Sequence, residues 1–178
     1  MKILNTKFKD LKIIQGERFL DPRGYFREVN KKKLLKKENL IFWCMSRSKK
    51  NILRGLHFQE KNAQGKYISV IKGKIFDVAV DLRPKSTTFK KTFTIILSDK
   101  NCKSLFLPSG FAHGFYTMEK ENLVFYGNTN YRHAKSENGI RWNDKDLNIK
   151  WPNKNPIVSK KDSSNLNLKD YLKLKNLK

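Results

Sequence analysis

The chain has 178 residues, 38% hydrophobic and 12% aromatic, a composition that predicts one globular domain over residues 1–178 and excludes a disordered chain. The formal net charge is +23, but the lysines are spread along the whole chain without zinc-finger spacing or an RNP-like aromatic run, so we expect no nucleic-acid partner. The charge indicates a lysine-rich surface, and it also suits a small anionic substrate such as a diphosphate.

In the first third of the chain, "DPRGYF" (residues 21–26) predicts a turn, and "KKKLLKKENL" (31–40) is the best internal helix candidate. The longest apolar run, "LIFWCM", has six residues, far fewer than the roughly 20 needed to cross a bilayer. The N-terminus has no apolar stretch typical of a signal peptide. With only two widely spaced cysteines, Cys44 and Cys102, these features predict free thiols and a cytoplasmic protein that does not bind membranes.

Residues 41–127 are rich in β-branched and aromatic residues and are broken by Gly, Pro, Asn and Ser. "KYISVIKGKIFDVAVDLRP" predicts two strands joined at Lys72-Gly73, and further short strands follow at roughly ten-residue spacing. This spacing is typical of a β-sandwich or barrel. The last stretch, "NLNLKDYLKLKNLK", predicts an amphipathic helix, with residues 170–178 as a frayed basic tail.

Two aspartates and two histidines stand in apolar, strand-like surroundings. Side-chain alternation in "KIFDVAVDLR" places Asp77 and Asp81 on one face with apolar neighbours. A buried carboxylate is costly unless it is paired, so we expect a cation or a histidine beside them. His57 in "GLHFQ" and His113 in "GFAHGFY" are either core residues or acid–base groups oriented by these carboxylates.

Other kinds of chemistry lack their motifs. No His-x-His pair of a metal-binding cupin is present, because Gln59 follows His57 at that spacing, so we expect no metal. There is no G-x-S-x-G nucleophile motif, and no G-x-G-x-x-G or Walker sequence, so we expect no cofactor. Acid–base chemistry by His, Tyr, Lys and Asp remains, with arginines to hold an anion.

Six motifs in register carry a resemblance to a known family: "DPRGYFRE", "LRGLHFQ", "QGKYISVIKGKIFDVAVDLRPKSTTF", "LPSGFAHGF", "WNDKDLNIKWP" and "SKKD". Over residues 1–162 the chain resembles the dTDP-4-dehydrorhamnose 3,5-epimerases. The resemblance implies a mainly β fold, a cupin-type double-stranded β-helix (jelly roll) with short peripheral helices. It also implies a metal-free homodimer that epimerises nucleotide-linked 4-keto sugars for deoxysugar or heptose biosynthesis, as in capsule or lipopolysaccharide.

The resemblance also implies roles for individual residues. His57 matches the catalytic base, Asp162 the carboxylate that holds it, Lys66 the enolate-stabilising lysine, and Tyr126 the acid on the other face of the sugar. Removing a proton from a C–H next to a ketone needs such an arrangement, since free imidazole alone is too weak a base. The expected substrate-binding residues are Arg54, Gln59, His113, Asp77 and Arg132, together with Arg23, Phe26 and Glu28 reaching across the dimer interface.

The chain departs from the family pattern in two places. Arg132 and Ala134 in "NYRHAKSE" replace a Tyr-x-Pro pair, and Phe42 and Cys44 in "IFWCMSRS" replace a glutamine and an asparagine. These changes lie in the nucleotide-reading and outer pocket, so two substrates stay open, dTDP-4-keto-6-deoxyglucose and a GDP-linked 4-keto heptose. A non-catalytic nucleotide-sugar-binding cupin and a 3,4-ketoisomerase are the alternative functions.

One geometric requirement follows from "ILRGLHFQ". Arg54 and His57 are three positions apart, so a regular strand would point them to opposite faces. If both contact one ligand, the strand must bulge or twist near Gly55.

Overall fold

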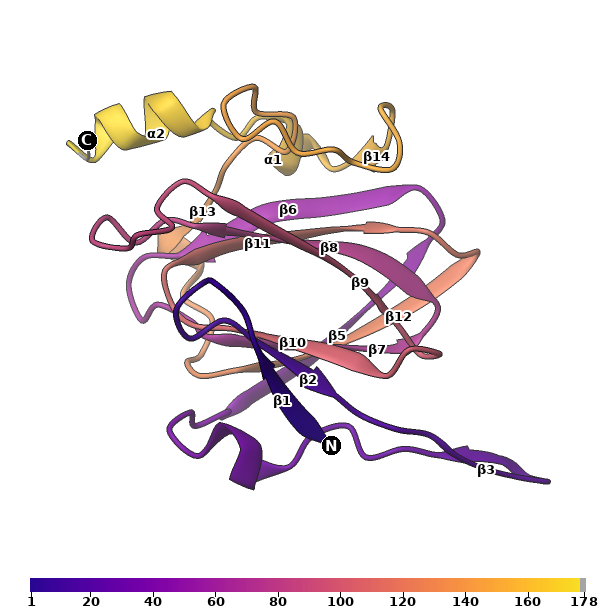
Figure 1. Cartoon of the computed structure of the whole chain (residues 1–178). Helices are drawn as coiled ribbons and strands as arrows, with labels where there is room; N and C mark the ends of the chain where they lie inside the picture. The colour runs from indigo at the N-terminus through magenta and orange to yellow at the C-terminus, as the bar shows by residue number, and fades with distance from the viewer. Residues whose placement is uncertain (177–178) are drawn as a thin grey trace.

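The computed structural model describes residues 1–176 and consists of two sheets packed face to face (Figure 1). Sheet I contains, in spatial order, β1 (Lys2–Asn5), β2 (Lys12–Gln15), β10 (Lys103–Leu107), β7 (Lys66–Lys72), β12 (Glu121–Asn128) and β5 (Phe42–Lys49). Sheet II contains β13 (Glu137–Gly139), β6 (Ile52–Gln59), β11 (Phe111–Thr117), β8 (Lys74–Asp81) and β9 (Thr92–Ser98). The short strand β14 (Ile157–Val158) pairs with β6 in parallel, and every other strand pair is antiparallel. The predicted two-strand unit, with its break at Gly73, is confirmed as β7 and β8.

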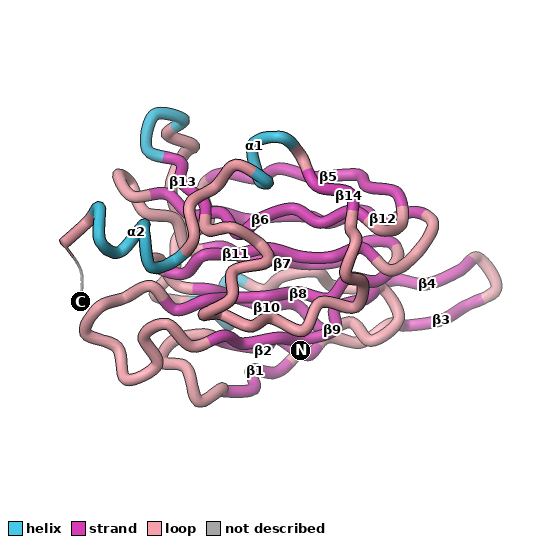
Figure 2. The backbone as a smooth tube through the Cα atoms, turned by 90° about the horizontal axis from the view of Figure 1, so that it is seen from above, coloured by secondary structure: helices cyan, strands magenta, loops and turns pink. Residues whose placement is uncertain are grey.

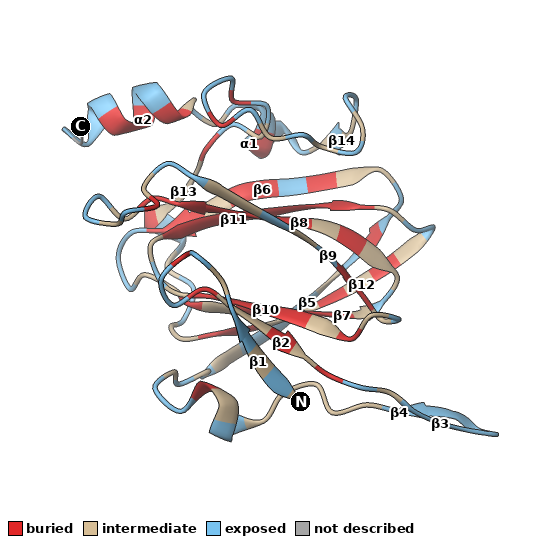
Figure 3. Ribbon diagram, viewed as in Figure 1, coloured by how far each residue is buried: buried red, intermediate tan, exposed pale blue. Residues whose placement is uncertain are grey.

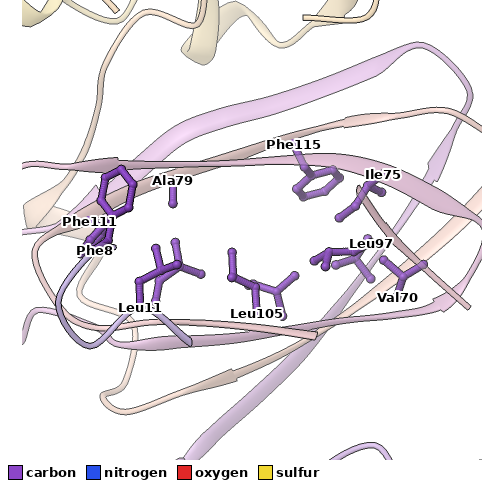
Figure 4. Close-up of a cluster of buried hydrophobic side chains, with 12 residues drawn as sticks. Phe8, Leu11, Val70, Ile75, Ala79, Leu97, Leu105, Phe111 and Phe115 are labelled. Carbon is purple, nitrogen blue, oxygen red and sulfur yellow. The ribbon is translucent and has the colours of Figure 1, made fainter. Parts of the chain in front are cut away.

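The core fills the space between the sheets with apolar side chains from both (Figure 4). Phe8 and Leu11, from the loop between β1 and β2, close one end of this core against Phe111. The predicted alternation in β8 is confirmed. Ile75 and Ala79 point into this core, while Val78 and Val80 belong to a second cluster on the outer side of sheet II.

The C-terminal quarter covers that outer side (Figure 1). The helices α1 (Lys160–Ser163) and α2 (Leu168–Leu174) lie over sheet II, and Phe58 of β6 packs edge-on against Tyr171. Tyr171 and Leu172 are buried, as Figure 3 shows for this helix, so the frayed tail expected from residue 170 does not begin there. The apolar face of α2 holds it against the sheet. Residues 177–178 of that expected tail lie outside the described residues.

The helix predicted over residues 31–40 is wrong in extent, because only a 3₁₀ turn, η1 (Lys32–Leu35), forms. Lysines at positions 32 and 36, and at 33 and 37, would stack like charges one turn apart, which disfavours a longer helix. Leu35 is buried against Ile14, Tyr67 and Phe106 on the outer side of sheet I, so packing retains the short turn.

The strands β3 (Phe19–Asp21) and β4 (Gly24–Phe26) form a hairpin that extends away from the two sheets (Figure 2). The turn predicted in "DPRGYF" is confirmed at its tip. All six strand residues are exposed, including Leu20 and Phe26 at 75% and 64%. We call this hairpin the arm. Among residues 1–176, no helix is long and apolar enough to span a bilayer.

Candidate active site

The β6 strand contains the irregularity that the sequence required. Its pairing with β11 shifts register between His113 and Phe115, so that His57 lies opposite His113 while Arg54 lies opposite Phe115. Both partners point into the space between the sheets, and the extra residue therefore brings Arg54 and His57 to the same face. Gly55 has φ +125°, and a Cβ there would lie 2.5 Å from the Cα of Gly114, so only glycine fits.

His57 on β6 forms a close pair with Asp162, which lies on the helix α1. Its Nε2 lies 2.6 Å from Asp162 Oδ1, and the backbone N–H of Gly55 donates to Asp162 Oδ2 at 3.0 Å. Ser159 caps α1 by accepting a hydrogen bond from the Asp162 backbone N–H, which sets the carboxylate against β6. Burial acts to raise the pKa of Asp162, but its bonds to His57 and Gly55 outweigh this and lower it. The ionised carboxylate orients the ring and leaves Nδ1 as the free acceptor.

A second pair, His113 and Asp77, lies deeper between the sheets. Their Nε2 and Oδ2 atoms are 2.8 Å apart, which confirms that a buried aspartate here takes a histidine partner. The His113 side chain is 5% exposed, whereas the His57 side chain is 39% exposed. His57 is therefore the histidine that an incoming ligand can meet.

Lys66 opens β7 and faces the same interior. Burial lowers the pKa of its ammonium, and the nearby carboxylate of Glu137 partly opposes this shift. A lysine in such a place supplies a positive charge in a weakly hydrated site, where it stabilises a developing anion more strongly than in water.

Tyr126 points inward from β12 on sheet I, opposite the histidines of sheet II. Its ring lies 6.5 Å from that of Phe115, which also neighbours His113. Its hydroxyl lies 2.8 Å from Ser46 Oγ, and burial raises the pKa of the phenol well above its ordinary value. Tyr126 thus stays protonated and reaches the interior from the sheet facing His57.

A cavity of about 470 Å³ at the edge of β6 brings together His57, Asp162 and Lys66. Tyr126, His113 and Asp77 are not among the residues that line it. The predicted residues that line it are Arg54, His57, Gln59, Lys66 and Asp162. It is also lined by polar residues that sequence reasoning did not select: Gln64, Glu137, Asn138, Ser159 and Lys161. Lys161 directly precedes Asp162 in "SKKD", which was a usable signal, whereas nothing local marked Glu137.

Three of the predicted binding residues, Arg54, Gln59 and Arg132, form hydrogen bonds with other residues of the chain. Arg54 donates from Nε to Ser48 Oγ at 3.0 Å and from Nη2 to the Arg47 carbonyl at 3.4 Å, and the residue as a whole is exposed. The Gln59 amide donates to the carbonyls of Asn62 and Tyr131, and its oxygen accepts from the His133 backbone N–H.

The Arg132 guanidinium holds Glu137 through two bonds, of 2.7 and 2.9 Å. These bonds are the main cause of a lowered Glu137 pKa. Arg132 therefore fixes a carboxylate that lines the cavity.

Within one chain, the residues expected to reach across the dimer interface stand apart from this cavity. Arg23 is paired with Asp21 at the tip, Phe26 is exposed, and Glu28 is paired with Lys31. Phe42 and Cys44 lie on β5, where the Asn128 amide donates to the Phe42 carbonyl at 3.2 Å and lies 3.8 Å from Cys44 Sγ. Asn128 pairs with Lys66 of β7 on its other side. Phe42 and Cys44, where the chain departs from the family pattern, therefore adjoin the Lys66 side of the site.

Within residues 1–176, no group of three or more His, Cys, Asp or Glu side chains is arranged to hold a metal ion. The side chains gathered between the sheets instead include a histidine–carboxylate pair, a buried lysine and a protonated tyrosine. Fold and site together define a cupin-type jelly roll with acid–base side chains between its sheets, the class of the cupin-fold isomerases.

Comparison with known proteins identifies the family. A family model described as dTDP-4-dehydrorhamnose 3,5-epimerase matches residues 5–170. The chain is 40% identical over 168 residues to the enzyme of that name from Shigella flexneri, covering 91% of this chain and 93% of that one. The structure of the Bacillus anthracis dTDP-4-dehydrorhamnose 3,5-epimerase, with TDP and PPi bound, matches with a TM-score of 0.89 and 41% identity over 94% of this chain and 99% of that one.

A third match is the Legionella pneumophila dTDP-6-deoxy-D-glucose-3,5-epimerase in complex with dTDP-4-keto-L-rhamnose, with a TM-score of 0.89 and 39% identity over 94% of this chain and 93% of that one. The chain belongs to the dTDP-4-dehydrorhamnose 3,5-epimerase family, and it is an isomerase of the nucleotide-sugar epimerase type. The fold and the family expected from the motifs are both confirmed.

Proposed function

We propose that the chain inverts C3 and C5 of dTDP-4-keto-6-deoxyglucose. The observation that carries this proposal is the cavity in which the His57–Asp162 pair and Lys66 meet. The relatives described above are named for dTDP-linked sugars, and the Legionella enzyme holds dTDP-4-keto-L-rhamnose, which supports a dTDP-linked substrate over a GDP-linked heptose.

The first half-reaction is proton removal next to the ketone. His57 Nδ1 accepts the proton from carbon, and the ionised Asp162 stabilises the imidazolium that forms. Charge then moves onto the C4 oxygen, and the Lys66 ammonium stabilises this enolate. Each of these groups alone is too weak, because a C–H beside a ketone is far less acidic than an imidazolium.

The second half-reaction is proton delivery to the opposite face. Tyr126 donates its hydroxyl proton to the carbon from sheet I, while His57 stays on the side of sheet II. Inversion requires two groups on opposite faces, and the two facing sheets supply them. The proton taken by His57 and the proton lost by Tyr126 are then exchanged with water, which restores both groups.

Positive side chains hold the substrate's diphosphate. Arg54 projects an exposed guanidinium next to His57, and Lys161 lines the cavity beside Asp162. Gln59 and Arg132 act by shaping the cavity wall, the first through loop 131–133 and the second through Glu137. His113 and Asp77 lie deeper between the sheets and do not line this cavity.

The working form that we propose is a homodimer in which each arm completes the partner's site. The arm exposes four large apolar side chains, Phe19, Leu20, Tyr25 and Phe26, that make no core contact in their own chain. The outer side of sheet I also exposes Trp43 and Met45. Exposed large apolar side chains gathered in this way are typical of an interface, and they support Arg23, Phe26 and Glu28 as residues that reach the nucleotide of the neighbouring subunit.

The test is incubation in D₂O with dTDP-4-keto-6-deoxyglucose and, separately, a GDP-linked 4-keto heptose, followed by mass spectrometry and NMR. A 3,5-epimerase adds two deuterons to the dTDP sugar and inverts both carbons. One deuteron would indicate a 3-epimerase, and a ketone moved to C3 would indicate a 3,4-ketoisomerase. Turnover of the heptose alone would overturn the dTDP assignment, and no exchange with either sugar would leave a binding protein.

A further inference from the structure

Ser46 is the residue that contacts the proposed acid. It lies on β5, the edge strand of sheet I, and its Oγ is 2.8 Å from Tyr126 Oη. Strand pairing places Ser46 opposite Val124 and Tyr126 opposite Cys44, so the two side chains are diagonal neighbours on the inner face of the sheet. Either hydroxyl can donate in this pair.

The chemistry selects one of the two directions. If Tyr126 donated to Ser46, its proton would point along the sheet and away from the ligand. If Ser46 donates to Tyr126, the phenol proton is free to point into the space between the sheets. Once that proton is transferred, the phenolate oxygen already has a hydrogen-bond donor in place.

The surroundings make this donor necessary. Burial disfavours the phenolate of Tyr126, and the Asp77 carboxylate disfavours it further, while Arg54 contributes a favourable charge. Within residues 1–176, Ser46 is the side chain that forms a hydrogen bond to this oxygen. A preorganised donor aimed at a developing anion contributes more in a weakly hydrated site than in water.

We propose that Ser46 is a positioning residue for proton delivery, which donates its hydroxyl hydrogen to Tyr126 Oη and stabilises the phenolate formed when Tyr126 protonates the sugar carbon. This inference rests on the proposed function, because it takes Tyr126 as the acid. It adds a residue that acts on one half-reaction and leaves proton removal by His57 unaffected.

The two half-reactions can be separated in D₂O. After His57 removes a proton, the enolate either receives a proton from Tyr126 and becomes epimerised, or takes a solvent-derived deuteron back from His57 and returns as labelled substrate. Slowing delivery from Tyr126 shifts this partition toward labelled substrate. A loss of general structure would lower both products together.

The experiment compares the wild type with Ser46→Ala, Ser46→Thr and the control Ser104→Ala on dTDP-4-keto-6-deoxyglucose. Ser104 is a buried serine on β10 of the same sheet, and its hydroxyl donates to Ser69 Oγ at 3.0 Å, away from Tyr126. We expect Ser46→Ala to lower the kcat for epimerisation about 10- to 100-fold, the range for losing a hydrogen bond to a charged oxygen. KM should stay within about twofold, and the ratio of labelled substrate to epimerised product should rise.

Ser46→Thr keeps the hydroxyl and should restore both kcat and the ratio, and Ser104→Ala should match the wild type. The inference is overturned if Ser46→Ala epimerises at the wild-type rate, if its exchange and epimerisation fall equally, or if Ser46→Thr behaves like the alanine variant. Failure of the proposed function has a different signature, because then the wild type itself neither exchanges nor epimerises this sugar.

Discussion

His57 and His113 carry the same side chain, each paired with an aspartate at similar distance, yet they differ in exposure. An imidazole can act on a substrate only where a ligand can reach it, so this difference favours His57 over His113 as the proposed base. We expect His57→Asn to lower solvent exchange by about 10²- to 10⁴-fold, the usual contribution of a positioned base.

The matching control is His133→Asn. His133 bonds to Ser136 in a loop and does not line the cavity, so exchange should stay near the wild-type level. Full exchange activity in His57→Asn would remove the assigned base and reopen the binding-protein interpretation.

The lowered pKa of Lys66 predicts that activity falls at high pH, which is the basic limb of the pH profile. Because burial lowers the pKa of this ammonium, it loses its proton at a lower pH than an exposed lysine does. The raised pKa of Tyr126 keeps the phenol protonated over the same range. We therefore expect kcat/KM for epimerisation to fall as pH rises, with the midpoint below the ordinary lysine value of about 10.4.

The Lys66→Arg variant tests whether the basic limb of the pH profile comes from deprotonation of Lys66 or of another group. Arginine keeps its charge throughout the accessible range, so the variant should be slower but should lose the basic limb. An unchanged limb in Lys66→Arg would assign it to another group.

At the scale of elements, the bulge in β6 depends on one glycine. Gly55→Ala would force a Cβ against the backbone of Gly114 at a φ that only glycine adopts readily. We expect destabilisation of about 1–3 kcal/mol in urea unfolding and a larger loss of activity than of stability, since the shift moves Arg54 and His57 together. Gly73→Ala is the control, because Gly73 also has positive φ and an added Cβ would lie 2.4 Å from the Glu121 carbonyl oxygen, but Gly73 does not line the cavity. It should cost stability without this active-site effect.

The turn after β8 is organised by Asp81. Its buried carboxylate accepts bonds from the Arg83 guanidinium and from the hydroxyls of Ser86 and Thr88. Burial acts to raise its pKa, but these bonds lower it to about 2. A pKa depressed below its unfolded value contributes stability above the unfolded value of about 3.9, and this contribution is lost as pH falls toward 2.

We expect Asp81→Asn to lower the free energy of unfolding by up to about 2 kcal/mol at pH 7, with a smaller difference from the wild type at pH 2.5. Urea titrations at both pH values measure this. The control is Asp146→Asn, because Asp146 is exposed, and this variant should change the free energy of unfolding little at either pH. A difference that stays constant with pH would show that the Asp81 charge is not what stabilises the turn.

At the scale of the whole molecule, the arm and the pocket are separate in one chain, so a shared site predicts complementation between subunits. An Arg23→Ala/Phe26→Ala variant and a His57→Asn variant should each be nearly inactive. Mixed and refolded together, they should recover about a quarter of wild-type activity, since half of random dimers are mixed and each has one complete site. No recovery, with mixed dimers verified by mass spectrometry, would show that each site is built within one chain.

The short-range pattern was enough to predict much of this molecule. Residues 66–82 carry a period-2 alternation that defines strands, faces and the burial of Asp77 and Asp81, because a strand's geometry depends on its own backbone. The need for a bulge at Gly55 followed from the same rule. Residues 31–40 were harder to predict, since local propensity favoured a helix over the whole segment. Repulsion between the lysines disfavours that helix, and packing retains only one turn.

The sequence by itself determined the fold class, the family motifs and the residue types available for proton transfer. The family motifs also implied that Asp162 holds His57, 105 positions away, and the structure confirms this contact. Only the tertiary structure decided that Tyr126 meets Ser46, 80 positions away, and that Glu137 lies at the cavity wall. The physical reason is that periodicity sets the direction of a side chain relative to its own strand. The distance between side chains, and their access to a ligand, arise only when the two sheets close on each other and the C-terminal segment packs across β6.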